Sequence, residues 1–239
     1  NLWAKRNFEM DAVDEIFAGS EEEQIGNADA GQIYRVTNMG IVGRVNYDYQ
    51  SKYLAEVSFR YDGSSKFAKG HRWGFFPSAS VGYRISEESF IKEFAPLSFI
   101  TNWKLRASYG AMGDDGSSSY QYLSGYDYPG ASYVFGDVVY KGLGFRSLPN
   151  ELITWYKSKT LNVGTDLDLW NGMLSAQVDF FWRYRDGLLG KRSGEVPGTI
   201  GAELPEENLN QDLYKGFEIV LGHRNKINDF NYSVSLNFA

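Results

Sequence analysis

Polar and apolar residues alternate one by one through most of this chain. In the segment 41–49, Ile41 and Val45 lie on one face of the pattern. Arg44 and Asp48 lie on the other. Successive side chains of a β-strand point to opposite faces, so a period of two is the mark of a strand. The pattern therefore predicts a strand with one apolar face and one polar face.

The same alternation recurs along the chain and predicts about eight strands of roughly ten residues, the length that a tilted strand needs to cross a bilayer. The predicted strands are 41–49, 53–62, 77–85, 103–109, 161–169, 174–184, 217–221 and 231–238. A turn follows each strand, so we expect an all-β fold, an antiparallel up-and-down meander without crossovers.

The connections between these strands alternate in length. The short ones are 50–52, 171–172 and 224–228, and the long ones are 63–75, 111–157 and 185–212. Short turns at one end and long loops at the other are typical of outer-membrane barrels. A soluble β-sandwich has no reason to sort its loops by length. The pattern thus favours part of a larger transmembrane β-barrel, with a large soluble β protein as the alternative.

Aromatic residues gather at both ends of the predicted strands. Those beside short turns are Tyr47, Tyr49, Tyr53 and Trp170, and those beside long loops are Phe59, Tyr61, Tyr109, Trp182 and Tyr184. Two aromatic bands around an aliphatic one match the profile of a bilayer. The alternative is that aromatic residues simply prefer strands.

Two segments outside the strands carry weaker patterns. The segment 87–101 lies on the short-turn side but is longer, and the run from Ser86 to Ile91 predicts a capped turn of helix there. Residues 1–32 are predicted to form a loop because they are rich in Glu, Asn, Asp and Gly. A short helix over 10–17 is the alternative.

Composition narrows the class of protein further. The mean hydropathy of −0.40 excludes a helical membrane protein. It allows a barrel, because half of the strand residues of a barrel face a polar lumen. The net charge of −6 argues against nucleic acid as a partner. The absence of cysteine removes disulfides, thiol catalysis and cysteine metal sites.

Candidate chemistry is sparse. His71 and His223 are the only histidines and have no partner at metal-binding spacing, so we expect no metal or cofactor. No G-x-S-x-G nucleophile motif occurs. The run Asp114-Asp115-Gly116 is interpreted as a turn. We therefore expect that the protein is not an enzyme.

Ordered motifs give the chain a family resemblance. The motifs are Gly43-Arg44-Val45-Asn46-Tyr47-Asp48-Tyr49, the block 58–67 with 72–78 and 82–86, Leu105-Arg106-Ala107-Ser108-Tyr109-Gly110 followed by Gly113-Asp114, Leu161-Asn162-Val163-Gly164 with Asp166, Val196-Pro197, Lys215-Gly216-Phe217-Glu218 and Asp229-Phe230-Asn231-Tyr232-Ser233. Together they resemble the SusC/RagA family of TonB-dependent outer-membrane transporters of Bacteroidetes-type bacteria. The resemblance implies an outer-membrane location and import of oligosaccharides or similar bulky nutrients. The alternative is a structural or adhesive surface β-barrel without transport.

The resemblance also implies what the rest of the protein contains. Members carry a plug domain inside the barrel and a segment that contacts TonB, and neither pattern is visible here. A barrel of this family has about twenty-two strands, so about eight make up only part of one. We therefore expect an internal-to-late piece of the barrel, with 1–32 as an extracellular loop and 33–239 as a partial barrel. The implied partners are TonB, a SusD-like surface lipoprotein, and a glycan or peptide ligand.

Charged residues on the polar face would line the lumen of such a barrel. They are Arg44, Asp48, Glu56, Arg60, Arg84, Lys104, Arg106, Asp166, Asp168, Asp179 and Arg183. We expect them to pair across neighbouring strands and to keep the lumen wet. The functional alternative is contact with the plug.

The long loop 111–157 carries the candidate binding residues. They are Tyr120, Tyr122, Tyr126, Tyr128 and Tyr133. Aromatic faces pack on sugar rings or on peptide side chains at little cost in side-chain entropy. We expect these tyrosines to contact the ligand or the lipoprotein lid, and the alternative is that they only stiffen the loop.

Overall fold

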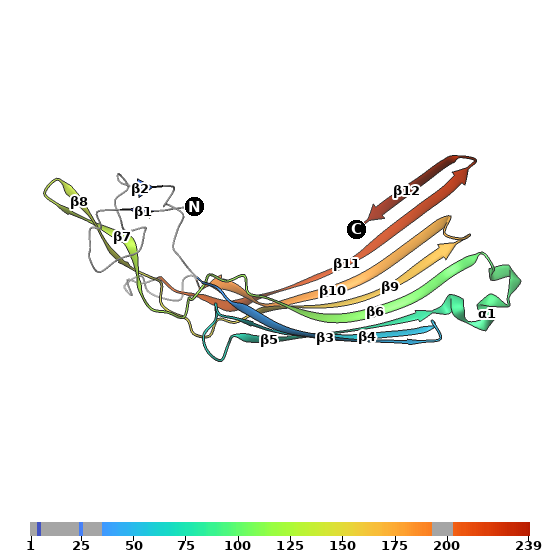
Figure 1. Cartoon of the computed structure of the whole chain (residues 1–239), viewed down its shortest axis with the longest axis horizontal. Helices are drawn as coiled ribbons and strands as arrows, with labels where there is room; N and C mark the ends of the chain where they lie inside the picture. Colours follow the sequence, from blue (N-terminus) through green and yellow to red (C-terminus); the bar gives the residue numbers. More distant parts are fainter. Residues whose placement is uncertain (1–3, 6–23, 26–34, 193–202) are drawn as a thin grey trace.

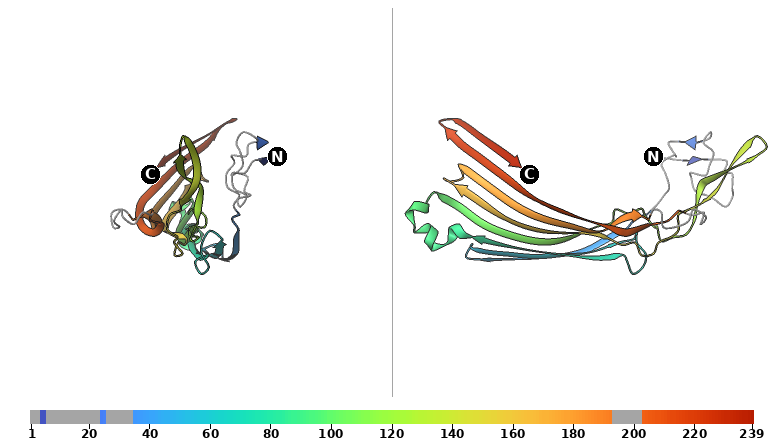
Figure 2. Two further views of the ribbon diagram at one scale, coloured as in Figure 1. Left: turned by 90° about the vertical axis from the view of Figure 1, so that its left-hand side faces the viewer. Right: turned by 180° about the vertical axis from the view of Figure 1, so that it is seen from behind.

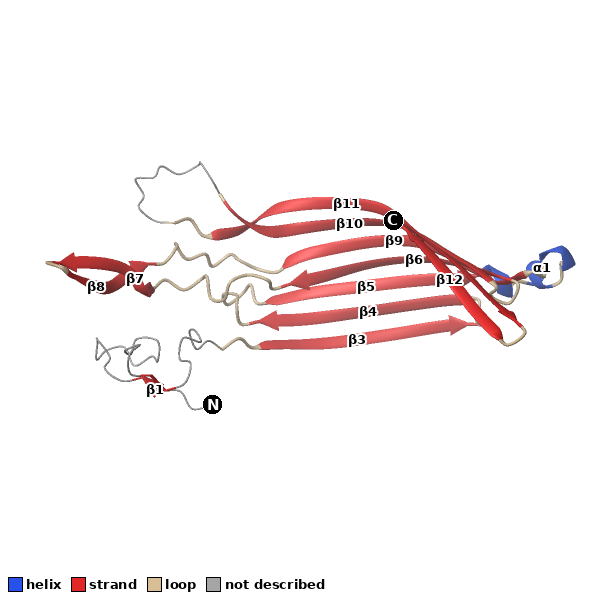
Figure 3. Ribbon diagram, turned by 90° about the horizontal axis from the view of Figure 1, so that it is seen from above, coloured by secondary structure: helices blue, strands red, loops and turns tan. Residues whose placement is uncertain are grey.

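The computed structural model describes residues 4–5, 24–25, 35–192 and 203–239 (Figure 1). Its main feature is an eight-stranded antiparallel sheet with the order β12-β11-β10-β9-β6-β5-β4-β3. The strands are β3 (Asn38–Tyr49), β4 (Tyr53–Ser64), β5 (Trp73–Arg84), β6 (Ile100–Asp114), β9 (Tyr156–Leu169), β10 (Leu174–Lys191), β11 (Glu206–Ile227) and β12 (Phe230–Phe238). Figure 3 shows the strands from β3 to β11 side by side, with β12 slanting across them where the sheet curls. The predicted meander is confirmed.

Several predicted loops are shorter than expected, because the strands continue past the predicted ends. β10 runs to Lys191 and β11 begins at Glu206, so half of the predicted loop 185–212 is strand and the predicted start at 217 is wrong. The extra length stays paired, with Arg185 opposite Asp212. At about 3.3 Å per residue, the two strands are therefore longer than a membrane crossing alone would need.

A hairpin stands inside the loop predicted at 111–157. It consists of β7 (Tyr126–Phe135) and β8 (Val138–Phe145), which pair with each other and with no strand of the large sheet. It projects past the long-loop end of the sheet in Figures 1 and 3. The hairpin within the predicted long loop was not predicted, although alternating residues on both sides of Gly136-Asp137 favour a two-stranded ribbon.

The connection between β5 and β6 forms short helical turns. They are η2 (Ile85–Glu87), α1 (Ser89–Lys92) and η3 (Ala95–Leu97). The predicted turn of helix is confirmed, but the predicted cap is wrong, since no side chain caps the start of α1 at Glu88. The Glu88 carboxylate instead accepts hydrogen bonds from Lys52, Tyr53 and Tyr83. This end of the sheet lies opposite the hairpin (Figure 1).

Near the chain start, β1 (Ala4–Lys5) pairs with β2 (Gln24–Ile25). The alternative helix at 10–17 lies outside the described residues. No helix in the described part of the chain has the length and apolar character needed to span a membrane.

The apolar face of the sheet is left open by the fold. Val45 is 71% exposed and Val57 58% exposed, although both lie mid-strand. Figure 2 shows from two further sides that the eight strands form a curved single layer. A soluble sandwich would bury this face against a second sheet. An open aliphatic face therefore requires another apolar medium or partner to cover it.

Aromatic rings border that face at both ends, and cross-strand pairing stacks them. Near the short turns, the rings of Tyr53 and Tyr83 lie 5.2 Å apart and those of Phe99 and Trp170 lie 5.5 Å apart. Near the long loops, the Tyr61 and Trp73 rings lie 4.8 Å apart. Over β4 and β5 these rings lie at the two ends with aliphatic residues between them. On β10 and β11, in contrast, Phe180 and Phe217 pair in the same cross-strand row as Val163, so the two predicted bands are not separate there.

Candidate functional site

The compact core of the described chain lies at the long-loop end of the sheet. Phe67, Phe76, Ile153 and Trp155 are buried together, with Leu189 packed against them. They come from the β4–β5 loop, strand β5, the segment before β9, and strand β10. The Trp155 ring lies 5.6 Å from the Phe67 ring and 5.4 Å from the Phe76 ring. We call these five residues the rim cluster.

Hydrogen bonds fix the rim cluster to the surrounding backbone. The Trp155 indole donates to the Arg72 carbonyl at 2.8 Å, and the Thr154 hydroxyl donates to the His71 carbonyl at 2.9 Å. The Asn208 side chain accepts from the Thr154 amide at 3.0 Å and donates to the carbonyls of Thr154 and Gly187. The segment before β9 is therefore held to the neighbouring loop and to two strands.

A glycine makes the close approach of one ring possible. The Phe76 ring lies against Gly113 of β6 so closely that a Cβ atom at Gly113 would overlap it. A larger residue there would push the ring off the sheet and open the rim cluster.

Beside the rim cluster lies a hollow of about 650 Å³, which we call the rim hollow. Phe76 and Trp155 contribute to its apolar wall, together with Met39 and Met112. Its charged wall consists of Arg60, Asp62, Asp114 and Asp115. The volume falls within the usual range of small-ligand sites.

The charged groups of the rim hollow are oriented by neighbours. Arg60 binds Asp62 through two hydrogen bonds of 2.9 and 3.1 Å. One Asp115 oxygen accepts from the Ser64 hydroxyl at 2.8 Å, and one Asp114 oxygen accepts from Tyr156 at 2.6 Å. A carboxylate has about four acceptor positions, so these acids can accept further hydrogen bonds. The hollow thus offers fixed acceptors and one guanidinium beside aromatic carbon.

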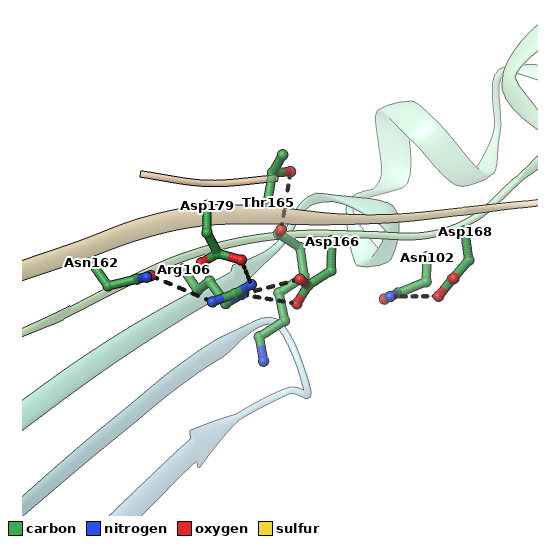
Figure 4. A network of polar contacts seen from close by, with 8 residues as sticks. Asn102, Arg106, Asn162, Thr165, Asp166, Asp168 and Asp179 are labelled. Atoms are coloured by element: carbon green, nitrogen blue, oxygen red, sulfur yellow. Dashed lines mark hydrogen bonds and ion pairs between the residues drawn. The ribbon is translucent and has the colours of Figure 1, made fainter. Parts of the chain in front are cut away.

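A second polar group lies further along the sheet on its charged face, and we call it the wall network (Figure 4). Arg106 of β6 donates to Asp166 of β9 at 3.1 Å and to Asp179 of β10 at 2.6 Å. Asn102 donates to Asp168 at 3.1 Å. One guanidinium therefore ties three adjacent strands together.

Gly164 makes room for the wall network. A Cβ atom at Gly164 would lie 2.6 Å from an Asp179 oxygen and 3.1 Å from the Arg106 guanidinium carbon. That same Asp179 oxygen is buried and has no hydrogen-bond partner in the described part of the chain.

The predicted cross-strand pairing of charges holds for some residues and fails for others. Arg44 reaches Glu56 on the next strand at 3.5 Å, as Arg106 reaches its two acids. Arg60 instead pairs within its own strand, and Arg84 pairs with Glu87 just after its strand ends. Within a strand, residues two apart share a face, which the prediction did not weigh.

The five predicted tyrosines occupy two places. Tyr120 and Tyr122 lie before the hairpin with their rings 6.2 Å apart, and the Tyr120 hydroxyl donates to the Arg35 carbonyl. Tyr126 begins β7 and packs 5.1 Å from the Phe145 ring, whereas Tyr133 lies seven residues further along β7 and is 53% exposed. The backbone of Tyr128 belongs to β7 as well. Their role in binding stays a prediction.

The two histidines lie apart from the rim hollow and the wall network. His223 contacts the Tyr232 hydroxyl at 3.0 Å, and His71 supplies a backbone carbonyl to Thr154. The described part of the chain brings no three His, Cys, Asp or Glu side chains into a metal-binding group.

Sequence reasoning missed the rim cluster and the rim hollow. Trp155 and the segment before it were assigned to a loop, because no period-two pattern covers them. The available signal was an isolated Trp within a long polar loop, which in a structured loop is often a packing anchor.

Comparisons with known proteins agree with this architecture. A family model described as "TonB dependent receptor-like, beta-barrel" matches residues 6–239. TonB-dependent receptor P3 of Formosa agariphila is 34% identical over 202 residues, which are 84% of this chain and 20% of that protein. TonB-dependent receptor SusC of Bacteroides thetaiotaomicron is 32% identical over 211 residues, which are 86% of this chain and 20% of that protein. The expected similarity to SusC is confirmed.

Solved structures share the fold. A chain of the RagAB peptide transporter superposes with a TM-score of 0.70 at 24% identity, over 98% of this chain and 25% of that one. The siderophore receptor PirA from Pseudomonas aeruginosa gives a TM-score of 0.53 at 14% identity, over 85% of this chain and 34% of that one. The chain spans about a fifth of the length of the curated relatives it matches.

Proposed function

Because this chain belongs to the TonB-dependent receptor-like β-barrel family, we propose that it forms part of the wall of an importer for bulky nutrients. Its eight strands are a segment of an outer-membrane β-barrel. The open aliphatic face then meets lipid and the charged face meets the lumen, since a charge facing lipid is costly. The observation that carries the proposal is a barrel wall with a formed hollow at its long-loop end.

The position of the rim hollow supports a role in ligand capture. Long loops of outer-membrane barrels are extracellular, so the hollow opens near the outside mouth of the lumen. Oriented carboxylates and a guanidinium beside Trp155 and Phe76 suit a ligand with many hydroxyl or amide groups. We therefore propose a glycan or a peptide as the ligand. The RagAB relatives in fold are described as a peptide importer.

The remaining parts of the importer lie outside this chain. Residues 33–239 would supply a partial barrel and 1–32 an extracellular loop, with the plug and further strands contributed by the rest of the protein. TonB would act on that remainder from the periplasm. A SusD-like surface lipoprotein would cover the mouth, where the β7–β8 hairpin projects. No enzymatic step is assigned to the barrel wall.

The test compares two arginines in the full-length protein. Arg60 lies in the rim hollow, whereas Arg44 lies outside it on the same face of the adjacent strand. Their side chains are 66% and 64% exposed, and each pairs with one carboxylate. We would first identify a binding oligosaccharide or peptide by calorimetry with the wild type. Arg60→Gln should then weaken binding about tenfold or more, the loss expected for a charged hydrogen bond, and Arg44→Gln should not.

An uptake assay distinguishes a transporter from a structural or adhesive surface protein. Labelled ligand should enter wild-type cells only when TonB is present, and the Arg60→Gln variant should take up less at limiting concentration. If the Arg60→Gln and Arg44→Gln variants bind the ligand equally well, the rim hollow is not the binding site. Uptake that is independent of TonB, or binding without uptake, would favour a structural or adhesive surface protein.

The hairpin tyrosines are tested separately. Replacing Tyr126 and Tyr133 together with alanine should lower uptake or reduce co-purification of the lipoprotein. Both side chains are more than half exposed, so the surface level of the protein should not change. Normal growth on the cognate nutrient would show that these tyrosines only stiffen the hairpin.

A further inference from the structure

Besides the rim hollow, the sheet has a hollow on its lipid-facing side, near the short-turn end. Its volume is about 510 Å³ and its wall is almost entirely apolar. Its floor is a cross-strand row of small side chains, Ala55, Val81, Ala107 and Val163, which face one another on four successive strands. Tyr53, Tyr83 and Leu105 border this row toward the short turns. We call it the interfacial hollow.

One end of the interfacial hollow joins a polar group. The rings of Tyr53 and Tyr83 stack at 5.2 Å with an interplanar angle of 7°, and both hydroxyls donate to Glu88 at 3.4 and 3.1 Å. Lys52 donates to the same carboxylate at 3.1 Å, and its side chain is 24% exposed. A lysine ammonium has three donors, so two remain for another acceptor.

Ion pairs surround this polar group. Lys92 and Arg84 both pair with Glu87, at 2.7 and 3.7 Å, beside the pair of Lys52 with Glu88. The partly exposed Lys52 amine can therefore donate to a phosphate oxygen while its partner carboxylate stays bound.

We propose that the interfacial hollow binds a phospholipid of the periplasmic leaflet. One acyl chain lies over the small-residue row, and the phosphate accepts from Lys52 at the edge of the tyrosine pair. Short turns of such barrels are periplasmic, and aromatic girdles mark the level of the headgroups. The hollow therefore lies at the depth of an acyl chain in the membrane, and the Lys52 amine lies at the depth of the lipid headgroups. The proposal does not depend on which nutrient is imported.

A lipid fits this place better than a second protein. The open face must be covered by apolar material in the membrane, and acyl chains are the material present there. A hollow of this volume, floored by alanine and valine, has room for part of a flexible apolar chain. A second copy of the protein would have to cover the aromatic bands on both sides of it as well. Such a copy is an outcome that the test must separate.

The test uses the purified full-length receptor reconstituted in nanodiscs of mixed phosphatidylethanolamine and phosphatidylglycerol. Native mass spectrometry, at energies that strip the surrounding lipid, counts the lipids retained. Ala107→Phe fills the hollow and Lys52→Met removes the amine. Ala79→Phe is the matched control, an outward alanine on β5 that lies outside the hollow. Heat-modified migration on gels verifies that each variant is folded.

The wild type should retain one phospholipid per barrel. Ala107→Phe should lower retention about tenfold, as expected when two buried CH₂ groups lose their contacts. Lys52→Met should lower retention of both phosphatidylethanolamine and phosphatidylglycerol, because the phosphate that they share loses its donor, and Ala79→Phe should behave as the wild type. A phosphatidylethanolamine with a diazirine in its acyl chain should also label wild-type peptides from β4 and β5.

Four results would overturn the proposal. They are no retained lipid in the wild type, unchanged lipid retention in a folded Ala107→Phe variant, an equal loss in the Ala79→Phe control, and absence of label on the β4 and β5 peptides. A protein dimer that disappears with Ala107→Phe, while lipid retention does not change, would assign the hollow to a second copy of the protein.

Discussion

Trp155→Ala should open the extracellular rim without unfolding the barrel wall. Trp155 is 9% exposed and packs on both Phe67 and Phe76. Removing a buried Trp side chain typically costs about 3–5 kcal/mol. The strands below the rim keep their cross-strand hydrogen bonds, so the loss should appear as local opening of the rim cluster.

The indole hydrogen bond contributes less than the packing. The Arg72 carbonyl also accepts from the Ser64 amide at 3.0 Å, so it keeps a partner when Trp155 is replaced. Trp155→Phe should therefore cost only about 1 kcal/mol for the lost hydrogen bond, in addition to the smaller ring. The two variants together separate ring packing from hydrogen bonding.

Amide hydrogen exchange on the full-length protein in detergent measures this opening. Peptides that cover 63–72 and 150–155 should lose more than about a hundredfold in protection in Trp155→Ala, the factor that corresponds to about 3 kcal/mol. Trp155→Phe should lose about tenfold or less. Peptides across the β9–β10 turn serve as the internal control. Unchanged protection at the rim in Trp155→Ala would refute the view that this cluster holds the loops.

Three further perturbations follow from named contacts. Gly164→Val should break the wall network and lower the free energy of unfolding by about 1–3 kcal/mol through overpacking. If the temperature at which the protein changes its migration on gels does not fall, this prediction is wrong. Lys52 holds the pKa of Glu88 below its ordinary value by hydrogen bonding, so the contact is stable at neutral pH and is lost as the pH falls through that lowered pKa. A spin label at Ser51 should be more mobile at acidic pH than at neutral pH, and in the Glu88→Gln variant it should be mobile at every pH. Equal mobility of the wild-type label at acidic and neutral pH would contradict this prediction. Asn208→Ala removes three hydrogen bonds and should speed proteolysis at 146–155, and a wild-type cleavage rate would argue against that role.

The strands could be predicted because each one repeats a local rule. Arg44 and Val45 lie on opposite faces whatever the partner strand is, and the alternation fixes the register once a turn is short. The β7–β8 hairpin was within reach of the sequence too. Gly136-Asp137 between Phe135 and Val138 is a hairpin turn signal that a long loop with many tyrosines obscured.

The candidate site was harder to predict, because it depends on contacts distant in sequence. Strands β6, β7 and β8 lie between Phe76 and Trp155 in the sequence. The rim cluster also needs Leu189 from β10. Nothing in the pattern around Trp155 shows which loop receives it. The same holds for Arg106, whose second acid, Asp179, lies two strands away. Strand periodicity gives a residue's face, but its partners follow from register and shear across the whole sheet.

The distribution of buried residues suggests a division of roles within this part of the barrel. The membrane-crossing part of the sheet is a single layer without a core of its own, so the lipid and neighbouring strands must stabilise it. The rim cluster, in contrast, is a small protein core with Phe67 only 1% exposed. Under the proposed function, the hollow beside this packed core is formed before a ligand binds, and a preformed site loses less entropy on binding. The packed rim therefore favours capture at the mouth by a site already in place.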